Sequence, residues 1–355
     1  MVSRFARLRT ASTIAAVSAA MVLGLASAPS ASAAPGAAGK GTIVARLTGP
    51  GAINDTIGRY NVFGTDLGVL WDNGHGEILA AFGDTQSING WSWLYGEMFY
   101  WRSNVLLKSR DHNLANGMTF SGHIGRPGHA KRLLKPTARE ITIIPTAGIA
   151  ANGKQYMSIM AVNHWGDPGT WKTRFSGLAV SSDNGRNWKA VNAFRPNGGG
   201  NRKFQMSAFL KEGGYVYIYG TPPGRAGAVY LARVPEAKIE HLGAYEYFSW
   251  GKWVKGNTGA ATPVMAAPTG ELSVAYNKYL GKYISLATRR GVVLRTADRP
   301  EGPWTSGQTV VPENDPYSGY APYIHPWSLN SPTLYFTYSI SLGYQVYLMR
   351  LPLRK

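Results

Sequence analysis

Short apolar or alternating runs recur along the whole chain, and glycine, asparagine and proline separate them. Helical periodicity is nearly absent. Runs of four to eight residues with a period of two, bounded by turn formers, are typical of β-strands. The pattern therefore predicts an all-β protein.

One arrangement occurs five times: an apolar strand, a turn, a second strand, a loop and a third strand. The third strands begin near five positions spaced 50 to 73 residues apart: Asn104, Gly177, Gly227, Gly291 and Tyr344. Repeats of this size are typical of the four-stranded blades of a propeller. We therefore predict a five-bladed β-propeller, and a two-sheet sandwich is the alternative that the repeats argue against.

Two further segments fit this fold. The early segment GTIVARL (41–47) is expected to complete the last blade, which would close the ring and leave no exposed sheet edge. The segment SSDNGRNW (181–188) matches the S-x-D-x-G-x-x-W pattern of an Asp-box. We expect Asp183 to bond the backbone of its own turn and to have no catalytic role.

The N-terminus has the layout of a secretory signal peptide. Three arginines precede a small apolar run, and Ala31-Ser32-Ala33 forms an A-x-A cleavage site. We predict a signal peptide over residues 1–33 and one propeller domain over 34–355. The expected product is an exported protein of the cell envelope with no stable membrane insertion after cleavage.

The amino-acid composition excludes some kinds of site and favours some kinds of partner. The chain has no cysteine, which excludes disulfides, thiolate metal sites and cysteine nucleophiles. It has 37 Lys and Arg against 19 Asp and Glu, a net charge of +18. Such a charge favours polyanionic partners, and export favours envelope polymers over nucleic acid. H-E-x-x-H, P-loop and G-x-S-x-G motifs are absent, and the seven histidines show no metal-ligand spacing.

Two aspartates interrupt the first hairpin, GTDLGVLWDNGHGEILAAFGDTQ (64–86). Asp and Gly are poor strand formers, so another requirement should hold Asp66 and Asp84 there. With a turn at Gly74-His75, the two lie nearly opposite each other on adjacent strands. Like charges there destabilise a sheet, whereas a close carboxyl pair has one raised pKa and suits glycoside hydrolysis. The alternative is that each Asp bonds turn amides or an arginine, with a slipped register.

Alignment of the repeats adds polar neighbours. Counting back from each first turn matches Asp66 with Pro145, Gln205, Glu271 or Leu272, and Ile324 or His325. Because first strands line the centre of a propeller, we predict a sugar-binding pocket that includes Gln205, Glu271 and His325. The segment WSWLYGEMFYW (91–101) could add rings that stack on sugars, or it could pack on the outside of the propeller.

Several motifs resemble one known family. GTDLGVLWDNG, AFGDT, WGDPGTW, SGLAVSSDNGRNW, GGYVYIYGTPPGRAGAVYLARV and YAPYIHPWSL are similar to the actinobacterial domain-of-unknown-function family 4185. The resemblance runs from about Leu47 to Arg350. It implies a five-bladed propeller with endo-D-arabinanase activity on the arabinogalactan and lipoarabinomannan of mycobacterial-type cell walls. It also implies that Asp66 and Asp84 are the catalytic pair.

The sequence leaves two main hypotheses. The first is an exported glycoside hydrolase that cleaves D-arabinan with the Asp66–Asp84 pair and requires no metal or cofactor. The second is a non-catalytic propeller that binds envelope carbohydrate through the same side chains. A sialidase is a weaker third possibility, because it rests on the Asp-box alone and no arginine cluster suited to a carboxylate substrate is evident.

Overall fold

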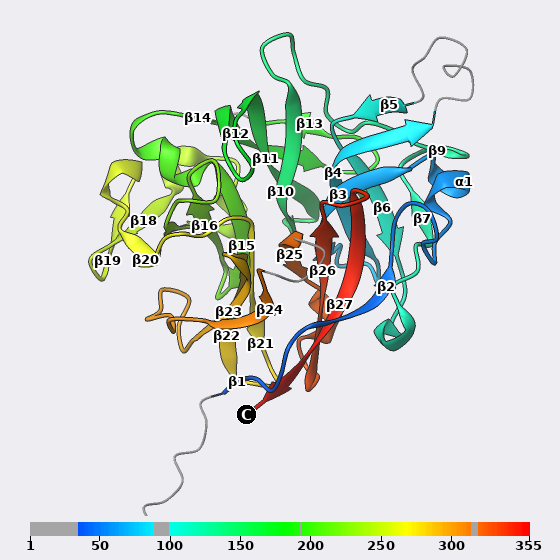
Figure 1. Cartoon of the computed structure of the whole chain (residues 1–355). Coiled ribbons are helices and arrows are strands. Elements are labelled where there is room, and N and C mark those ends of the chain that lie inside the picture. Colours follow the sequence, from blue (N-terminus) through cyan, green and yellow to red (C-terminus); the bar gives the residue numbers. More distant parts are fainter. Residues whose placement is uncertain (1–34, 89–98, 192, 314–318) are drawn as a thin grey trace, which may run out of the picture. The chain divides into compact units, whose positions relative to one another are not determined.

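The five repeats form five antiparallel β-sheets, the blades, set around a common centre (Figure 1). The structure is a computed structural model and describes residues 35–88, 99–191, 193–313 and 319–355. These residues form one unit, Pro35–Lys355. The predicted signal peptide and most of the aromatic segment 91–101 lie outside the described residues.

The first three blades follow one another along the chain. Blade 1 consists of β3 (Gly64–Asp72), β4 (Ile78–Ile88), β6 (Val105–Ser109) and β7 (Gly122–His123), with β5 (Phe99–Arg102) beside β4. Blade 2 consists of β10 (Thr142–Ala151), β11 (Lys154–Trp165), β12 (Trp171–Ser181) and β13 (Lys189–Ala190), with β14 (Arg195–Pro196) beside β12. Blade 3 consists of β15 (Met206–Glu212), β16 (Tyr215–Thr221), β17 (Val229–Pro235), β18 (Glu246–Ser249) and β19 (Lys252–Lys255), with β20 (Pro263–Met265) beside β17.

The last two blades contain the ring closure. Blade 4 consists of β21 (Leu272–Asn277), β22 (Lys282–Thr288), β23 (Gly291–Ala297) and β24 (Gln308–Pro312). Blade 5 consists of β25 (Gly319–Ile324), β26 (Thr333–Ile340) and β27 (Gln345–Arg354), with β1 (Gly36–Ala37) and β2 (Thr42–Arg46). A two-stranded sheet, β8 (Gly125–Arg126) and β9 (His129–Ala130), and the short helix α1 (Thr56–Tyr60) lie outside the blades. Single 3-10 turns occupy the remaining helical positions: 114–116, 199–204, 236–238, 242–244, 258–260 and 326–328.

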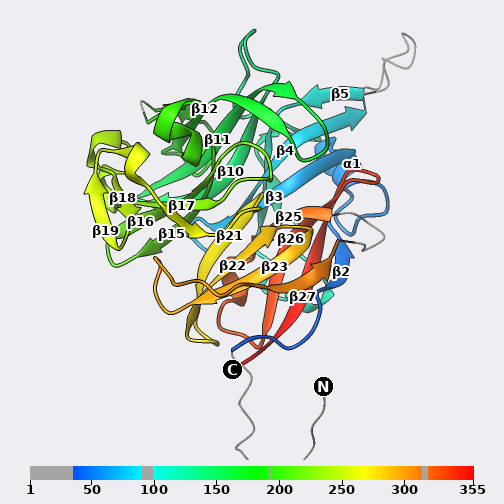
Figure 2. The ribbon, with the colours of Figure 1, turned by 60° about the vertical axis from the view of Figure 1, so that its left-hand side comes forward.

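The blades close into a ring, as predicted. The first strand of each blade contacts the first strand of the next, in the order β3, β10, β15, β21 and β25, and β25 contacts β3 again. The closing contact is the antiparallel pairing of β2 with β27, in which Thr42 faces Arg350 and Arg46 faces Tyr347 (Figure 2). The five-bladed propeller and the role of segment 41–47 are therefore confirmed, and the sandwich alternative is wrong.

Apolar side chains fill the spaces between neighbouring blades. Five buried clusters are found, each centred on one interface between blades. Trp71 and Met157, for example, meet between blades 1 and 2, and Phe82 and Leu348 meet between blades 1 and 5. Because apolar burial is the main favourable term in folding, the interfaces hold the ring together without disulfides.

The Asp-box is a structural turn, as expected. Asp183 Oδ1 accepts hydrogen bonds from the Asn187 backbone N–H (2.9 Å) and the Ser181 hydroxyl (2.8 Å). Its other carboxylate oxygen accepts from the Asn187 side chain at 2.7 Å.

Among the described residues, no helix is long and apolar enough to cross a membrane.

The interface between blades 1 and 2 predicts a sensitive glycine. A Cβ placed on Gly148 of β10 would lie 2.1 Å from Cε3 of Trp71 on β3. We expect Gly148→Ala to lower the free energy of unfolding by about 1–3 kcal/mol, because a buried indole must move. Urea unfolding would show a lower midpoint. Gly122→Ala is the control, since a Cβ there meets nothing within 4 Å, and an equal loss in both variants would contradict the prediction.

Candidate active site

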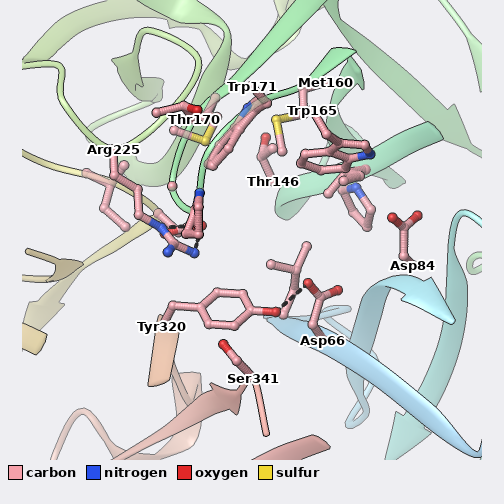
Figure 3. A pocket seen from close by; sticks show the side chains of 18 of the residues that line it. Asp66, Asp84, Thr146, Met160, Trp165, Thr170, Trp171, Arg225, Tyr320 and Ser341 are labelled. Carbon is pink, nitrogen blue, oxygen red and sulfur yellow. Dashed lines mark hydrogen bonds and ion pairs between the residues drawn. The ribbon is translucent and has the colours of Figure 1, made fainter. Parts of the chain in front are cut away.

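The two aspartates lie at an irregularity in the β3–β4 ladder. Thr65 pairs with Thr85 and Leu67 pairs with Phe82, so Asp66 alone faces both Gly83 and Asp84. The register shifts again beyond Leu67, which has a φ of 69° and precedes Gly68 with a φ of 73°. A bulge of this kind re-aims side chains locally. The two carboxyls, expected nearly opposite each other, are thus offset but line one cavity (Figure 3).

Glycine is required beside the first carboxyl. A Cβ on Gly83 would lie 2.4 Å from Asp66 Oδ1, so no other residue leaves this space for the side chain. Gly68 lies against Val346 and Thr337 with a positive φ, where an L side chain is strained. These requirements explain why two poor strand formers stand beside Asp66 in an otherwise apolar hairpin.

Asp66 has one hydrogen-bonded oxygen. The phenol of Tyr320 on β25 donates to Asp66 Oδ2 at 2.8 Å (Figure 3). Asp66 Oδ1 is buried and has no hydrogen-bond partner among the described residues. A buried acceptor without a partner is uncommon in native proteins. This oxygen is therefore available to a ligand or a proton.

Asp84 is held from the second blade. The hydroxyl of Thr142, the first residue of β10, donates to Asp84 Oδ1 at 2.5 Å. Thr65 donates to the Asp84 backbone carbonyl at 3.3 Å. Neutral hydroxyls thus position both carboxyls.

Burial makes both carboxyls weak acids. Desolvation raises the pKa of Asp84 to about 7, although the Thr142 hydrogen bond opposes the rise. Desolvation, followed by the charge of Asp84, raises the pKa of Asp66 to about 7, and the Tyr320 hydrogen bond opposes it. With both pKa values near 7, the state with one acid and one carboxylate is populated at neutral pH. Acid–base chemistry requires that state.

All five blades contribute to the cavity around the pair. Its volume is about 330 Å³. Besides the aspartates, its lining includes Ile144, Trp165 and Trp171 from blade 2, Met206 and Arg225 from blade 3, Glu271 from blade 4, and Tyr320, Tyr323 and Tyr344 from blade 5. Apolar and aromatic walls with a few polar groups are typical of a ligand site.

Glu271 lies in this cavity, as predicted, but its charge is neutralised. The Arg225 guanidinium binds it with two nitrogens, Nε at 3.0 Å from Oε2 and Nη2 at 2.9 Å from Oε1. The same guanidinium lies 4.7 Å from the centre of the Tyr320 ring. Glu271, Arg225 and Tyr320 therefore form a continuous polar chain that ends at Asp66.

The predicted placement of Gln205 in the pocket is wrong. Gln205 is fully buried and follows a 3-10 turn directly before β15. Its oxygen accepts from the Thr173 hydroxyl at 2.7 Å, and its nitrogen donates to the carbonyls of Arg195 and Asn201. The turn directs the side chain into the blade 2–blade 3 contact and away from the cavity.

The predicted placement of His325 in the pocket is also wrong. β25 begins beside the cavity with Tyr320 and ends at Ile324, which lines a second cavity of about 420 Å³. His325 follows that end, is fully buried, and accepts from the Trp327 N–H through Nδ1 at 3.2 Å. Counting back from the turn misplaced it because the 3-10 turn Pro326–Ser328 lengthens this connection.

Sequence reasoning missed Trp165, Trp171, Arg225, Tyr320 and Tyr344 as site residues. The order of the strands could have indicated four of these residues. Asp84 lies near the end of a second strand, so every connection from second to third strand lies at the same end of the propeller. Trp165 and Trp171 flank that connection in blade 2, and Arg225 and Tyr344 lie within it in blades 3 and 5.

The described part of the chain shows no cluster of three or more His, Cys, Asp or Glu side chains that could hold a metal ion. The aromatic residues 91–98, expected near the site as one alternative, lie outside the described residues.

The raised pKa values predict a pH-dependent stability. Aspartate in an unfolded chain titrates near 3.9, so the folded protein binds more protons between about pH 4 and 7. The free energy of unfolding therefore falls as the pH rises through this window. We expect Asp66→Asn or Asp84→Asn to stabilise the protein at pH 8 by about 1–3 kcal/mol, with less gain at pH 4.5.

Urea unfolding of each variant at both pH values measures this gain. The control is Asp298→Asn, because the Asp298 side chain is 77% exposed. A gain of the same size at both pH values would contradict the assignment of raised pKa values.

Solved structures share this propeller. A putative hydrolase from Bacteroides ovatus ATCC 8483 superposes with a TM-score of 0.58 at 14% identity, over 82% of this chain and 86% of that chain. A glycosyl hydrolase from Bacteroides ovatus superposes with a TM-score of 0.51 at 11% identity, over 88% and 93%. At such identities the likeness concerns the fold.

Two comparisons concern sequence. Notoamide biosynthesis cluster protein J from Aspergillus sp. (strain MF297-2) is 29% identical over 312 residues, which cover 82% of this chain and 80% of that protein. Its name refers to a biosynthesis cluster and to no glycosidase.

The family model described as "Domain of unknown function (DUF4185)" matches residues 51–350. Since this match takes in both aspartates and strands of all five blades, the chain belongs to the DUF4185 family.

Proposed function

We propose that the protein is an exported glycoside hydrolase that cleaves α-linked D-arabinofuranose chains within the D-arabinan of mycobacterial-type cell walls. The observation that carries the proposal is the pair of buried aspartates with pKa values of about 7 in one cavity. One protonated carboxyl donates to the leaving glycosidic oxygen. The other, ionised, acts as nucleophile or as the base that activates water.

The walls of the cavity suit a sugar chain. Trp165 and Trp171 pair at the β11–β12 connection and meet edge to face, with ring centres 6.1 Å apart. Trp165 is 43% exposed. Aromatic rings offer a flat apolar surface to the C–H faces of sugars. The Arg225–Glu271 pair offers donors and acceptors to hydroxyl groups. The similarity to family 4185 motifs, together with the net charge of +18, supports arabinan in an anionic envelope as the substrate.

A binding propeller without catalysis is the second candidate. The same aromatic rings would serve it, and its two aspartates would act as acceptors for sugar hydroxyls. A site that only binds sugar does not require carboxyl groups with pKa values near 7. The raised pKa values of Asp66 and Asp84 therefore favour the hydrolase.

The first test is product analysis. The purified protein lacking residues 1–33 is incubated with mycobacterial-type arabinogalactan, and released oligosaccharides are separated by chromatography. We expect a ladder of arabinan fragments from the wild type, and a loss of about 100-fold or more in Asp66→Asn and in Asp84→Asn, because each removes one proton-transfer group. Asp298→Asn should retain wild-type activity. Polymer binding without products would favour the binding propeller instead.

A second test concerns Tyr320. Its hydrogen bond stabilises the ionised form of Asp66, so Tyr320→Phe should raise the pKa of Asp66 further. We expect the limb of the kcat/KM pH profile that belongs to Asp66 to move to higher pH. Tyr276→Phe, at an exposed tyrosine of blade 4, is the control. A lowered rate with an unmoved pH profile would limit Tyr320 to a packing role.

A further inference from the structure

The ion pair between Arg225 and Glu271 lies in the wall of the aspartate cavity. Glu271 is 7% exposed, and the side chain of Arg225 is 32% exposed. Nε of Arg225 donates to both carboxylate oxygens, at 3.0 and 3.2 Å, and Nη2 donates to Oε1 at 2.9 Å. A guanidinium bound through two nitrogens has a fixed plane. The pair therefore places one positive and one negative charge at defined positions in the cavity.

Close contacts with two other blades hold the stem of Arg225 in place. Its backbone N–H donates to the carbonyl of Gly169, in the β11–β12 connection of blade 2, at 3.0 Å. A Cβ on Gly169 would lie 3.4 Å from Arg225 Cδ, and a Cβ on Gly270, before β21 of blade 4, would lie 2.7 Å from Arg225 Cγ. The stem thus runs closely over two glycines, which leaves it little freedom to turn away from Glu271.

The same guanidinium is connected to Asp66 through Tyr320. Its central carbon lies 4.7 Å from the centre of the Tyr320 ring, a distance at which a cation is attracted to an aromatic face. The Tyr320 hydroxyl donates to Asp66 Oδ2 at 2.8 Å, and Figure 3 shows the ring extending from beside Arg225 to Asp66. An arginine fixed against this ring therefore helps to keep the hydroxyl directed at Asp66.

The two charges of the pair act on Asp66 with opposite signs. After desolvation and the charge of Asp84, the Glu271 carboxylate also raises the pKa of Asp66. Burial lowers the pKa of Arg225, but the charges of Glu271 and Asp66 raise it. Because this interaction is mutual, the guanidinium favours the ionised form of Asp66. The other titratable groups that face Asp66 are Asp84 on β4, Tyr320 and Tyr323 on β25, and Tyr344 in the β26–β27 connection.

We propose that the Arg225–Glu271 pair positions Asp66 for acid–base chemistry, by holding Tyr320 against this carboxyl and by balancing the charge around it. The inference deepens the proposed function and rests on it, since it takes Asp66 as a reacting group. Without Glu271, the guanidinium charge would keep Asp66 ionised. Without Arg225, the charge of Glu271 would keep Asp66 protonated. With both present, Asp66 can be an acid or a carboxylate near neutral pH.

A double-mutant cycle followed by NMR tests the pair. The carboxyl signals of protein labelled with ¹³C-aspartate are measured against pH in the Asp84→Asn background, so that the midpoint belongs to Asp66 and not to two coupled acids. The Asp66 signal is assigned by its loss in Asp66→Asn. We expect Glu271→Gln to lower the midpoint by about half a pH unit or more, and Arg225→Gln to raise it by a similar amount. The double variant should return close to the starting midpoint, because both charges are gone.

Glu246→Gln is the matched control. Glu246 forms an ion pair with Arg233 at 2.8 Å, and neither residue lines the aspartate cavity. This variant should leave the Asp66 midpoint where it was. Shifts of the same sign in Glu271→Gln and Arg225→Gln, or no shift in either, would overturn the proposal, because loss of packing alone does not reverse sign with the charge removed. If one of the two does not fold, the sign of the shift in the other decides.

The titration involves no substrate, so it separates this inference from the proposed hydrolysis. Opposite shifts in a protein that does not cleave arabinan would support the charge balance and reject the hydrolase. Arabinan cleavage with unmoved midpoints would support the hydrolase and reject the role of the pair. In the active protein, the limb of the kcat/KM pH profile that belongs to Asp66 should move in the same direction as the NMR midpoint.

Discussion

The pairing of β2 with β27 is the constraint on which the rest of the structure depends. It joins residues 42–46 to the last strand of the chain and completes the fifth blade. With the ring closed, the innermost strand of each blade lies against those of two neighbouring blades, and each blade packs on two others. The first strands then converge on one axis. For this reason side chains from five distant parts of the chain line a single cavity.

The three carboxyls in that cavity have different hydrogen-bond partners, and this difference makes two of them suited to proton transfer. Glu271 is bound by two nitrogens of Arg225, which compensates its burial. Asp66 receives hydrogen bonds from the neutral hydroxyls of Tyr320 and Tyr344, and Asp84 receives one from the hydroxyl of Thr142. Neutral donors offset less of the cost of desolvation than an arginine does. The two aspartates therefore have raised pKa values near neutral pH. Arg225 is bound to Glu271 instead of to either aspartate.

The sequence by itself determined the all-β class, the five blades, the ring closure and the shared location of Asp66, Asp84 and Glu271. These features follow from local patterns: period-two runs, repeated turns, and two aspartates placed symmetrically about one turn. A sequence pattern also revealed the Asp-box turn, because its hydrogen bonds join residues within eight positions. Spacing in the sequence was sufficient wherever a feature is local or repeats from blade to blade.

Only the tertiary structure decided the rest of the site. The bulge at Asp66 depends on contacts of Gly68 with blade 5, and the partners Tyr320 and Thr142 come from other blades. His325 was misplaced because a 3-10 turn lengthens the connection after β25, and Gln205 because the 3-10 turn before it directs its side chain away from the cavity. The physical reason is common to all of these. Hydrogen bonds join residues as far as 308 positions apart, and Asp66 and Tyr320 are 254 positions apart. Only the closed ring brings such residues together.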